Sequence, residues 1–173
     1  FVDHTWNEKF SSAIGYSRQD IDNTDAQAPN AFKSGQYALG NLIADAQRSA
    51  GKGDVAIMNN GGIRTELRAG DATYGSLFEL QPFGNTLYSL TMTGAQLRGL
   101  LEAMLSKSGV DDHVSGLTIR FDPSKPKGSR LVSATMADGT ALNDNKTYNV
   151  IVNDFLATGG EGYDAGKRAT SMR

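Results

Sequence analysis

An apolar run that leads directly into a glycine-rich segment is the feature that most constrains how this chain can fold. Tyr148 to Val152 is a short apolar stretch, which predicts a buried strand. A phenylalanine and three glycines around one acid then follow: Phe155, Gly159, Gly160, Glu161 and Gly162. Glycine permits positive φ angles and lets the backbone approach a ligand closely, so this segment is poor material for a core. It predicts either a binding loop at a strand end or an ordinary tight turn.

Two further segments have the same character. Residues 56–64 run from an apolar strand into Gly61 and Gly62 and end on Arg64. Residues 81–86 place Phe83 beside Gly84 at the start of another expected strand. A phenylalanine offers a flat face and an acid accepts hydrogen bonds from hydroxyls, a combination that suits a base joined to a sugar.

Taken in order, the three segments resemble the C-terminal domain of the 5′-nucleotidase family, which includes bacterial UDP-sugar hydrolases and related nucleotide phosphoesterases. The resemblance runs from about Ile14 to Tyr163 and includes residues 38–46, which are similar to the family's first helix. It implies an α+β fold, with mixed α/β layers in which mixed sheets are covered by outer helices. It also implies that residues 1–13 end an interdomain linker, that residues 14–173 form the substrate-binding domain, and that the N-terminal metallophosphatase domain is absent from this chain.

Composition narrows the function classes. The 173 residues fit one domain, and the net charge of -2 gives no electrostatic attraction to a nucleic-acid polymer or an anionic membrane. No apolar stretch approaches the ~20 residues that span a bilayer. The chain contains no cysteine and starts without a leader or a methionine, so we expect a piece of a longer precursor. A periplasmic, secreted or cell-surface location is implied by the family resemblance alone.

The periodicity predicts helices and strands in a mixed order. Helical spacing covers residues 34–50, 75–80 and 94–106, with Thr93 as the N-cap of the last helix. Strands are expected at residues 12–21, 54–58, 86–92, 116–121, 130–136 and 147–152. Early alternation of helices and strands followed by clustered strands is typical of a layered α+β or α/β domain.

Phe83 and Phe155 are the central candidates for ligand binding. In the family that the chain resembles, phenylalanines at the matching positions hold a nucleobase between them. Stacking of this kind contributes ~1–3 kcal/mol per base and tolerates different bases, because every base has a π-face. The alternative is that each ring fills the core beside its strand.

Polar residues complete the predicted substrate-binding set. Arg64 and Asn59 match family positions that contact substrate, and a guanidinium suits phosphate or ribose hydroxyls. Lys33 stands where family members commonly carry arginine, so it is either a weaker phosphate contact or an ordinary surface lysine. Glu161 stands where the family has aspartate that accepts hydrogen bonds from the ribose. Two glycines complete the set, Gly159 and Gly160.

No residue of this chain is expected to be catalytic or to bind a metal. A two-metal phosphoesterase needs many His, Asp and Asn ligands, and the only two histidines are His4 and His113. We expect His4 to lie in the linker and His113 to lie solvated in a loop. The resemblance implies that two divalent metal ions belong to the missing catalytic domain, so the fragment alone should be inactive.

Two functions of different class follow. The first is the substrate-recognition domain of a 5′-nucleotidase-type phosphoric monoester hydrolase, with its own N-terminal metallophosphatase domain and a nucleoside or nucleotide as partners. The second is a stand-alone, non-catalytic nucleoside- or nucleotide-binding protein. The sequence upstream of Phe1 would separate them, and the identity of the base stays open because stacking is tolerant.

Overall fold

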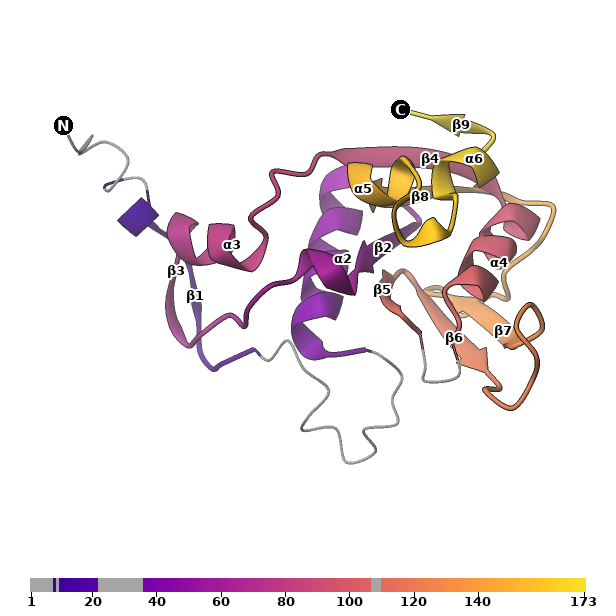
Figure 1. The fold of residues 1–173 in the computed structure, drawn as a ribbon, viewed down its shortest axis with the longest axis horizontal. Coiled ribbons are helices and arrows are strands. Elements are labelled where there is room, and N and C mark those ends of the chain that lie inside the picture. The colour runs from indigo at the N-terminus through magenta and orange to yellow at the C-terminus, as the bar shows by residue number, and fades with distance from the viewer. Residues whose placement is uncertain (1–7, 9, 22–35, 107–109) are drawn as a thin grey trace.

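The computed structural model describes residue 8 and residues 10–21, 36–106 and 110–173. Helices and strands are mixed in the first half of the chain, and four strands then follow one another before the short C-terminal helices (Figure 1). In order they are β1 (Ala13–Ser17), α2 (Ala38–Gly51), β2 (Val55–Asn59), η2 (Asn60–Gly62), β3 (Gly70–Thr73), α3 (Tyr74–Leu80), β4 (Leu87–Thr93), α4 (Gly94–Ala103), β5 (Asp112–Ser115), β6 (Leu117–Phe121), β7 (Leu131–Met136), β8 (Thr147–Asn153), α5 (Asp154–Ala157), η3 (Gly160–Gly162), α6 (Ala165–Arg168) and β9 (Ser171–Met172).

The main sheet has five strands in the order β5-β2-β8-β4-β9. Strand β8 pairs in parallel with β2, with Val150 opposite Val55, and antiparallel with β4, with Asn153 opposite Leu87. The carboxyl ends of β2 and β8 and the amino end of β4 therefore lie at the same edge of the sheet. Each of these three strand ends adjoins one of the glycine-containing segments.

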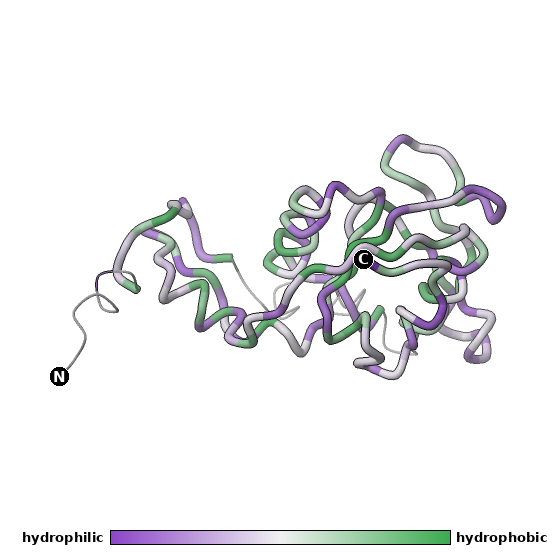
Figure 2. The backbone as a smooth tube through the Cα atoms, turned by 90° about the horizontal axis from the view of Figure 1, so that it is seen from above, coloured by the Kyte–Doolittle hydropathy of each residue, from purple (hydrophilic) through white to green (hydrophobic). Residues whose placement is uncertain are grey.

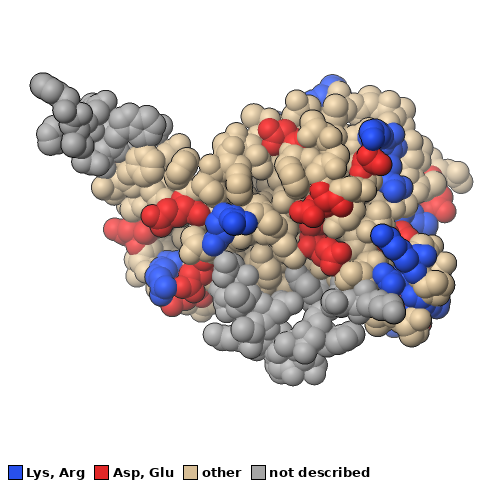
Figure 3. Space-filling model, viewed as in Figure 1, with Lys and Arg blue, Asp and Glu red and all other residues tan. Residues whose placement is uncertain are grey.

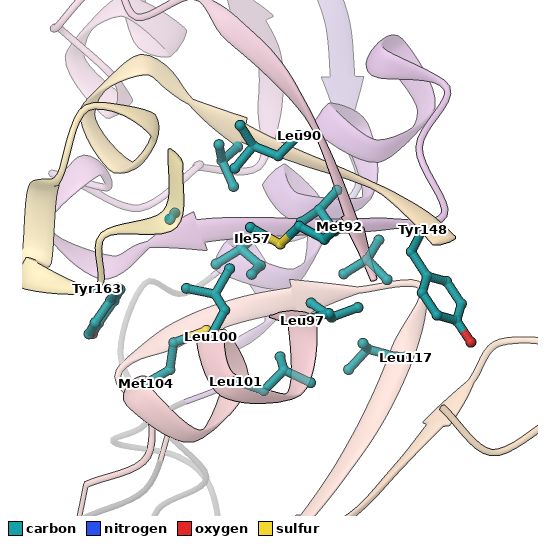
Figure 4. Close-up of a cluster of buried hydrophobic side chains, with 14 of the residues drawn as sticks. Ile57, Leu90, Met92, Leu97, Leu100, Leu101, Met104, Leu117, Tyr148 and Tyr163 are labelled. Atoms are coloured by element: carbon teal, nitrogen blue, oxygen red, sulfur yellow. The ribbon is translucent and has the colours of Figure 1, made fainter. Parts of the chain in front are cut away.

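Both faces of the main sheet are covered, which explains the continuous apolar runs of its central strands. Successive side chains of a strand point to opposite faces. In β2, Met58 packs in one buried cluster with Leu39 and Ile43 of α2, while Ile57 packs in another. In that second cluster, Figure 4 shows Leu97 and Leu100 of α4 near Ile57.

A smaller unit lies beside the main body. Strands β1 and β3 form an antiparallel two-stranded sheet, and α3 follows β3 directly. Figure 1 shows α2 between this unit and most of the main sheet, and Figure 2 shows the part of the chain nearest the N-terminus extending to one side of the main body. On β1, Ile14 and Tyr16 are exposed.

The expected α+β class is confirmed, with mixed sheets and outer helices. All six expected strands and all three expected helices are present within the described residues, with shifted ends. The predicted N-cap is also confirmed, because Thr93 Oγ1 accepts a hydrogen bond from the Gln96 N–H. Most of the predicted linker, residues 1–13, lies outside the described residues. In the part of the chain that is described, no helix has the length and apolarity that a bilayer crossing requires.

The prediction that His113 is solvated in a loop was wrong. His113 lies in β5 and is fully buried, packed edge-on against the Tyr37 ring at a centroid distance of 4.1 Å. Its Nδ1 lies 3.3 Å from Asn41 Oδ1, and its buried Nε2 has no hydrogen-bond partner in the part of the chain that the structure describes. This edge strand was not predicted, because its sequence is polar and has no apolar pattern. It is buried because α2 packs over it.

Gly40 of α2 makes this packing possible, and its replacement should be costly. A Cβ atom at position 40 would overlap the His113 ring. Gly40→Ala should therefore lower the free energy of unfolding by about 1–3 kcal/mol despite the better helix propensity of alanine. Urea unfolding measures this, with Ser49→Ala at an exposed position of α2 as the control. A Gly40→Ala protein as stable as the control would contradict the close packing.

Candidate functional site

The three glycine-containing segments meet at one edge of the main sheet. Asn59 is the last residue of β2, Asn153 is the last residue of β8, and Leu87 opens β4 opposite Asn153. Because β2 and β8 are parallel neighbours, the segments after them leave the sheet side by side. The segment that carries Phe83 arrives at the same place, since β4 runs in the opposite direction to β8.

Hydrogen bonds fix these segments relative to one another. Asn153 Nδ2 donates to Asn59 Oδ1 at 2.8 Å, and Asn153 Oδ1 accepts from the Leu156 N–H, which caps α5. The Asp154 N–H donates to the Thr86 carbonyl at 2.9 Å, which joins the segment of Phe155 to that of Phe83. The buried Asn153 thus uses both ends of its amide to hold this edge of the sheet in place.

A cavity of about 160 Å³ opens between the segments. It is lined by Asn59, Gly61, Gly62, Phe83, Asn85, Phe155 and Glu161. Phe83 and Phe155 are 55% and 45% exposed, so neither residue is part of the core. Asn59 is only 4% exposed, and it contributes mainly through its hydrogen bond to Asn153. The structure therefore brings four of the predicted residues to one hollow.

Backbone geometry around Glu161 explains the glycines of this loop. Gly159 has a φ of 108°, which favours glycine, and a Cβ atom at Gly160 would collide with the Phe155 ring. Glu161 itself has a φ of 59°, a conformation that side-chain-bearing residues other than Asn and Asp seldom adopt. Its Oε1 lies 3.7 Å from where a Gly61 Cβ would stand. The carboxylate is therefore held over the η2 segment at the price of local backbone strain.

Arg64 lies beside the cavity and is exposed. Its backbone N–H donates to Leu80 O at 2.9 Å, and its Nη1 donates to Gly61 O at 3.1 Å. The guanidinium carbon lies 5.9 Å from the centre of the Phe83 ring, within the range of a cation–π interaction. Part of the guanidinium group therefore remains available to a ligand next to the Phe83 ring. Lys33, the other predicted cation, lies outside the described residues.

A buried acid stands behind the site. Asp112 is 1% exposed, and no described residue forms a hydrogen bond with its Oδ2. Burial, followed by the negative charge of Glu161, raises the pKa of Asp112 to about 8. Burial and the charges of Asp112, Asp111 and Glu161 also raise the pKa of the Tyr163 phenol. The charges of these acidic groups thus affect one another's pKa values. On the face drawn in Figure 3, basic and acidic side chains are interspersed.

The residues that sequence reasoning missed are Asn85, Gly61 and Gly62. The signal for Asn85 was present, because an amide directly after Phe83-Gly84 can face the same ligand as the ring. Gly61 and Gly62 were recognised as part of the motif but not as cavity walls. Within the described residues, no group of three or more His, Cys, Asp or Glu side chains is arranged to hold a metal ion.

Comparisons with known proteins agree with this geometry. The family profile described as the C-terminal domain of 5′-nucleotidase matches residues 13–168. The chain belongs to the 5′-nucleotidase C-terminal domain family. Its fold is similar to that in the crystal structure of a 5′-nucleotidase precursor from Thermus thermophilus, with a TM-score of 0.84 and 31% identity over 98% of this chain and 35% of that one.

Curated relatives carry several different names. The chain is 45% identical to an endonuclease (YhcR) of Bacillus subtilis over 72% of this chain and 10% of the relative. It is 36% identical to a cell wall protein (Lmo0130) of Listeria monocytogenes over 92% of this chain and 22% of the relative. It is 34% identical to a 5′-nucleotidase of Vibrio cholerae over 78% of this chain and 24% of the relative. The chain thus spans a quarter or less of these relatives' lengths.

The pKa of Asp112 predicts an unusual pH dependence of stability. The folded chain keeps this proton up to about pH 8, whereas the unfolded chain loses it near pH 3.8, so stability falls as pH rises between these values. Burial lowers the pKa of His113 from 6.5 to about 4. This group therefore makes stability rise with pH between about pH 4 and pH 6.5 and has no effect above that range. Of these two effects, only that of Asp112 acts between pH 6.5 and pH 8.

We therefore expect the free energy of unfolding to fall between pH 6.5 and pH 8, by at most about 1.4 kcal/mol per pH unit. Asp112→Asn should remove this fall, because its amide does not titrate. Urea unfolding across this range measures it. Asp138→Asn serves as the control, since the lowered pKa of Asp138 confines its titration to acid. A fall that persists unchanged in Asp112→Asn would contradict the assignment.

Proposed function

We propose that this chain is the substrate-recognition domain of a 5′-nucleotidase-type hydrolase and that it binds the base and the sugar of a nucleotide. The observation that carries the proposal is the cavity in which two exposed phenylalanines and a carboxylate meet. Solvent-exposed aromatic rings at a cavity mouth gain little from the fold. They can gain from a stacked base.

Each group has a distinct part in this proposal. Phe83 and Phe155 hold the base by stacking on it. Glu161 accepts hydrogen bonds at neutral pH, so its natural partners are the ribose hydroxyls. Arg64 supplies a positive charge beside Phe83, where it can reach a phosphate group. Gly159 and Gly160 shape the loop that holds Phe155 and Glu161 in position.

The chemistry itself would take place elsewhere. In the proposed whole protein, a separate N-terminal domain with two divalent metal ions would cleave the phosphate ester through an activated water. The present chain would bind the nucleotide so that its phosphate lies at those metals, and its contribution would be positioning. The greater length of the relatives supports a further domain. The similarity to a cell wall protein supports a location in the cell envelope or outside the cell.

The paired rings give the most direct test. Phe83→Ala and Phe155→Ala should each weaken adenosine binding by about ten- to a hundredfold, because each change removes one stacking face worth ~1–3 kcal/mol. Isothermal titration calorimetry measures the loss. The matched control is Phe78→Ala, since Phe78 lies on α3, outside the cavity, and is 44% exposed. If Phe78→Ala weakens binding as much as Phe155→Ala does, the proposed stacking of the base on Phe83 and Phe155 is wrong.

The carboxylate gives a second test with a different readout. Glu161→Gln should weaken the binding of ribonucleosides by about ten- to a hundredfold, because hydrogen bonds to charged acceptors are strong. Binding of 2′,3′-dideoxynucleosides should hardly change. Glu161→Asp restores the family's shorter acid and relieves the positive-φ strain, so it should retain ribose preference. Equal losses for ribose and dideoxyribose ligands in Glu161→Gln would show that the carboxylate does not contact the sugar.

A further inference from the structure

A second and larger hollow adjoins the base-binding cavity and has no part in the function proposed so far. It encloses about 350 Å³. Four carboxamide side chains contribute to its wall, together with small or apolar groups that include Ala46, Ala50 and Leu87. The four carboxamides are Gln47, Gln81, Asn85 and Asn153. Among the described residues, no charged side chain lines it. We call this hollow the amide pocket.

The amide pocket adjoins the proposed base-binding cavity. The two hollows share Phe83 and Asn85, whereas Glu161 lines only the smaller one. Asn153 lines the amide pocket and donates to Asn59, which lines the smaller cavity. In adenosine and cytidine, the exocyclic amino group lies on the side of the base opposite the ribose. A nucleoside with its ribose at Glu161 and its base on Phe83 would therefore direct the base edge toward Asn85 and the amide pocket.

Gln47 is poorly hydrogen-bonded for a half-buried amide. Its Nε2 donates to the thioether sulfur of Met58, at 3.2 Å, and a thioether is a weak acceptor. Its Oε1 is buried without a hydrogen-bond partner among the described residues. Gln81 Nε2 also points at the Met58 sulfur, at 3.6 Å. If the Gln47 side chain turns toward a ligand, it breaks only a weak hydrogen bond. Its unpaired oxygen can then accept a hydrogen bond from an N–H group of the ligand.

We propose that the amide pocket binds the edge of the nucleobase opposite the sugar, with Gln47 accepting a hydrogen bond from an exocyclic amino group. This inference rests on the function proposed above. The pocket is larger than an amino group needs, so it also takes an uncharged alkyl substituent on that nitrogen. Gln47 is in this sense a specificity-determining residue, and the favoured ligands are nucleosides with an amino or a monoalkylamino group at this edge.

The first arm of the test compares adenosine with purine riboside, which lacks the amino group. By isothermal titration calorimetry, the wild-type chain should bind adenosine about three- to tenfold more tightly, the range that one neutral hydrogen bond supplies. Gln47→Leu should remove this preference by weakening adenosine binding alone. Gln19→Leu, the same change at an exposed residue outside both hollows, should preserve it. Equal binding of the two ligands by the wild-type chain would overturn the assignment of Gln47.

The second arm fills the pocket from the exposed end of α2. Wild-type chain should bind N6-propyladenosine at least as tightly as adenosine. Ala50→Phe places a ring in the amide pocket from an exposed helix position, so it should weaken N6-propyladenosine binding about tenfold and adenosine binding far less. Unchanged N6-propyladenosine binding in Ala50→Phe would overturn the pocket. If no nucleoside binds the wild-type chain, the proposed function fails and this inference fails with it. If nucleosides bind and the binding depends on Phe83 and Phe155 but shows no preference for the amino group, only this inference is overturned.

Discussion

Strand β8 is the element on which both the core and the proposed site depend, because it pairs with β2 on one side and β4 on the other. Its apolar residues Tyr148, Val150, Ile151 and Val152 are almost fully buried between the two covered faces of the sheet. Its last residue, Asn153, is hydrogen-bonded to the end of β2 and caps α5. The same register that closes the core thus brings Phe83, Phe155 and Glu161 to one cavity. A shift of β8 by one residue would reverse its faces and separate them.

The locally unfavourable features of the chain gather at this edge. Two phenylalanine rings face solvent, Glu161 adopts a positive φ, and Asp112 is buried beside the negative charge of Glu161. Each of these costs folding free energy, and a well-packed main sheet can offset that cost. The proposed site for a flat, hydroxyl-bearing ligand would account for the first two features. For Asp112, the structure shows the energetic cost and the coupling to the site, and the described residues contain no group that pairs its free oxygen.

Much of the fold was predictable from the sequence, because the central strands are apolar runs and the long helices have clear periodicity. The elements that escaped prediction are short or polar. Strand β5 contains Asp112 and His113, and only the tertiary cover of α2 buries them. For the site, the glycine-flanked phenylalanines carried a sequence signal. The amide pocket had no such sequence signal, because Gln47 and Asn85 line the same hollow only through the packing of α2 against the sheet. Spacing along the chain cannot predict such a contact.

The central claim is that one nucleotide-binding cavity forms where β2, β8 and β4 meet at the sheet edge. A crystal structure of the chain with bound adenosine monophosphate tests it most directly. The account predicts the base between Phe83 and Phe155, the ribose hydroxyls within hydrogen-bond distance of Glu161, and the phosphate on the side of Arg64. A nucleotide bound elsewhere on the molecule, with the two rings unoccupied, would contradict the account.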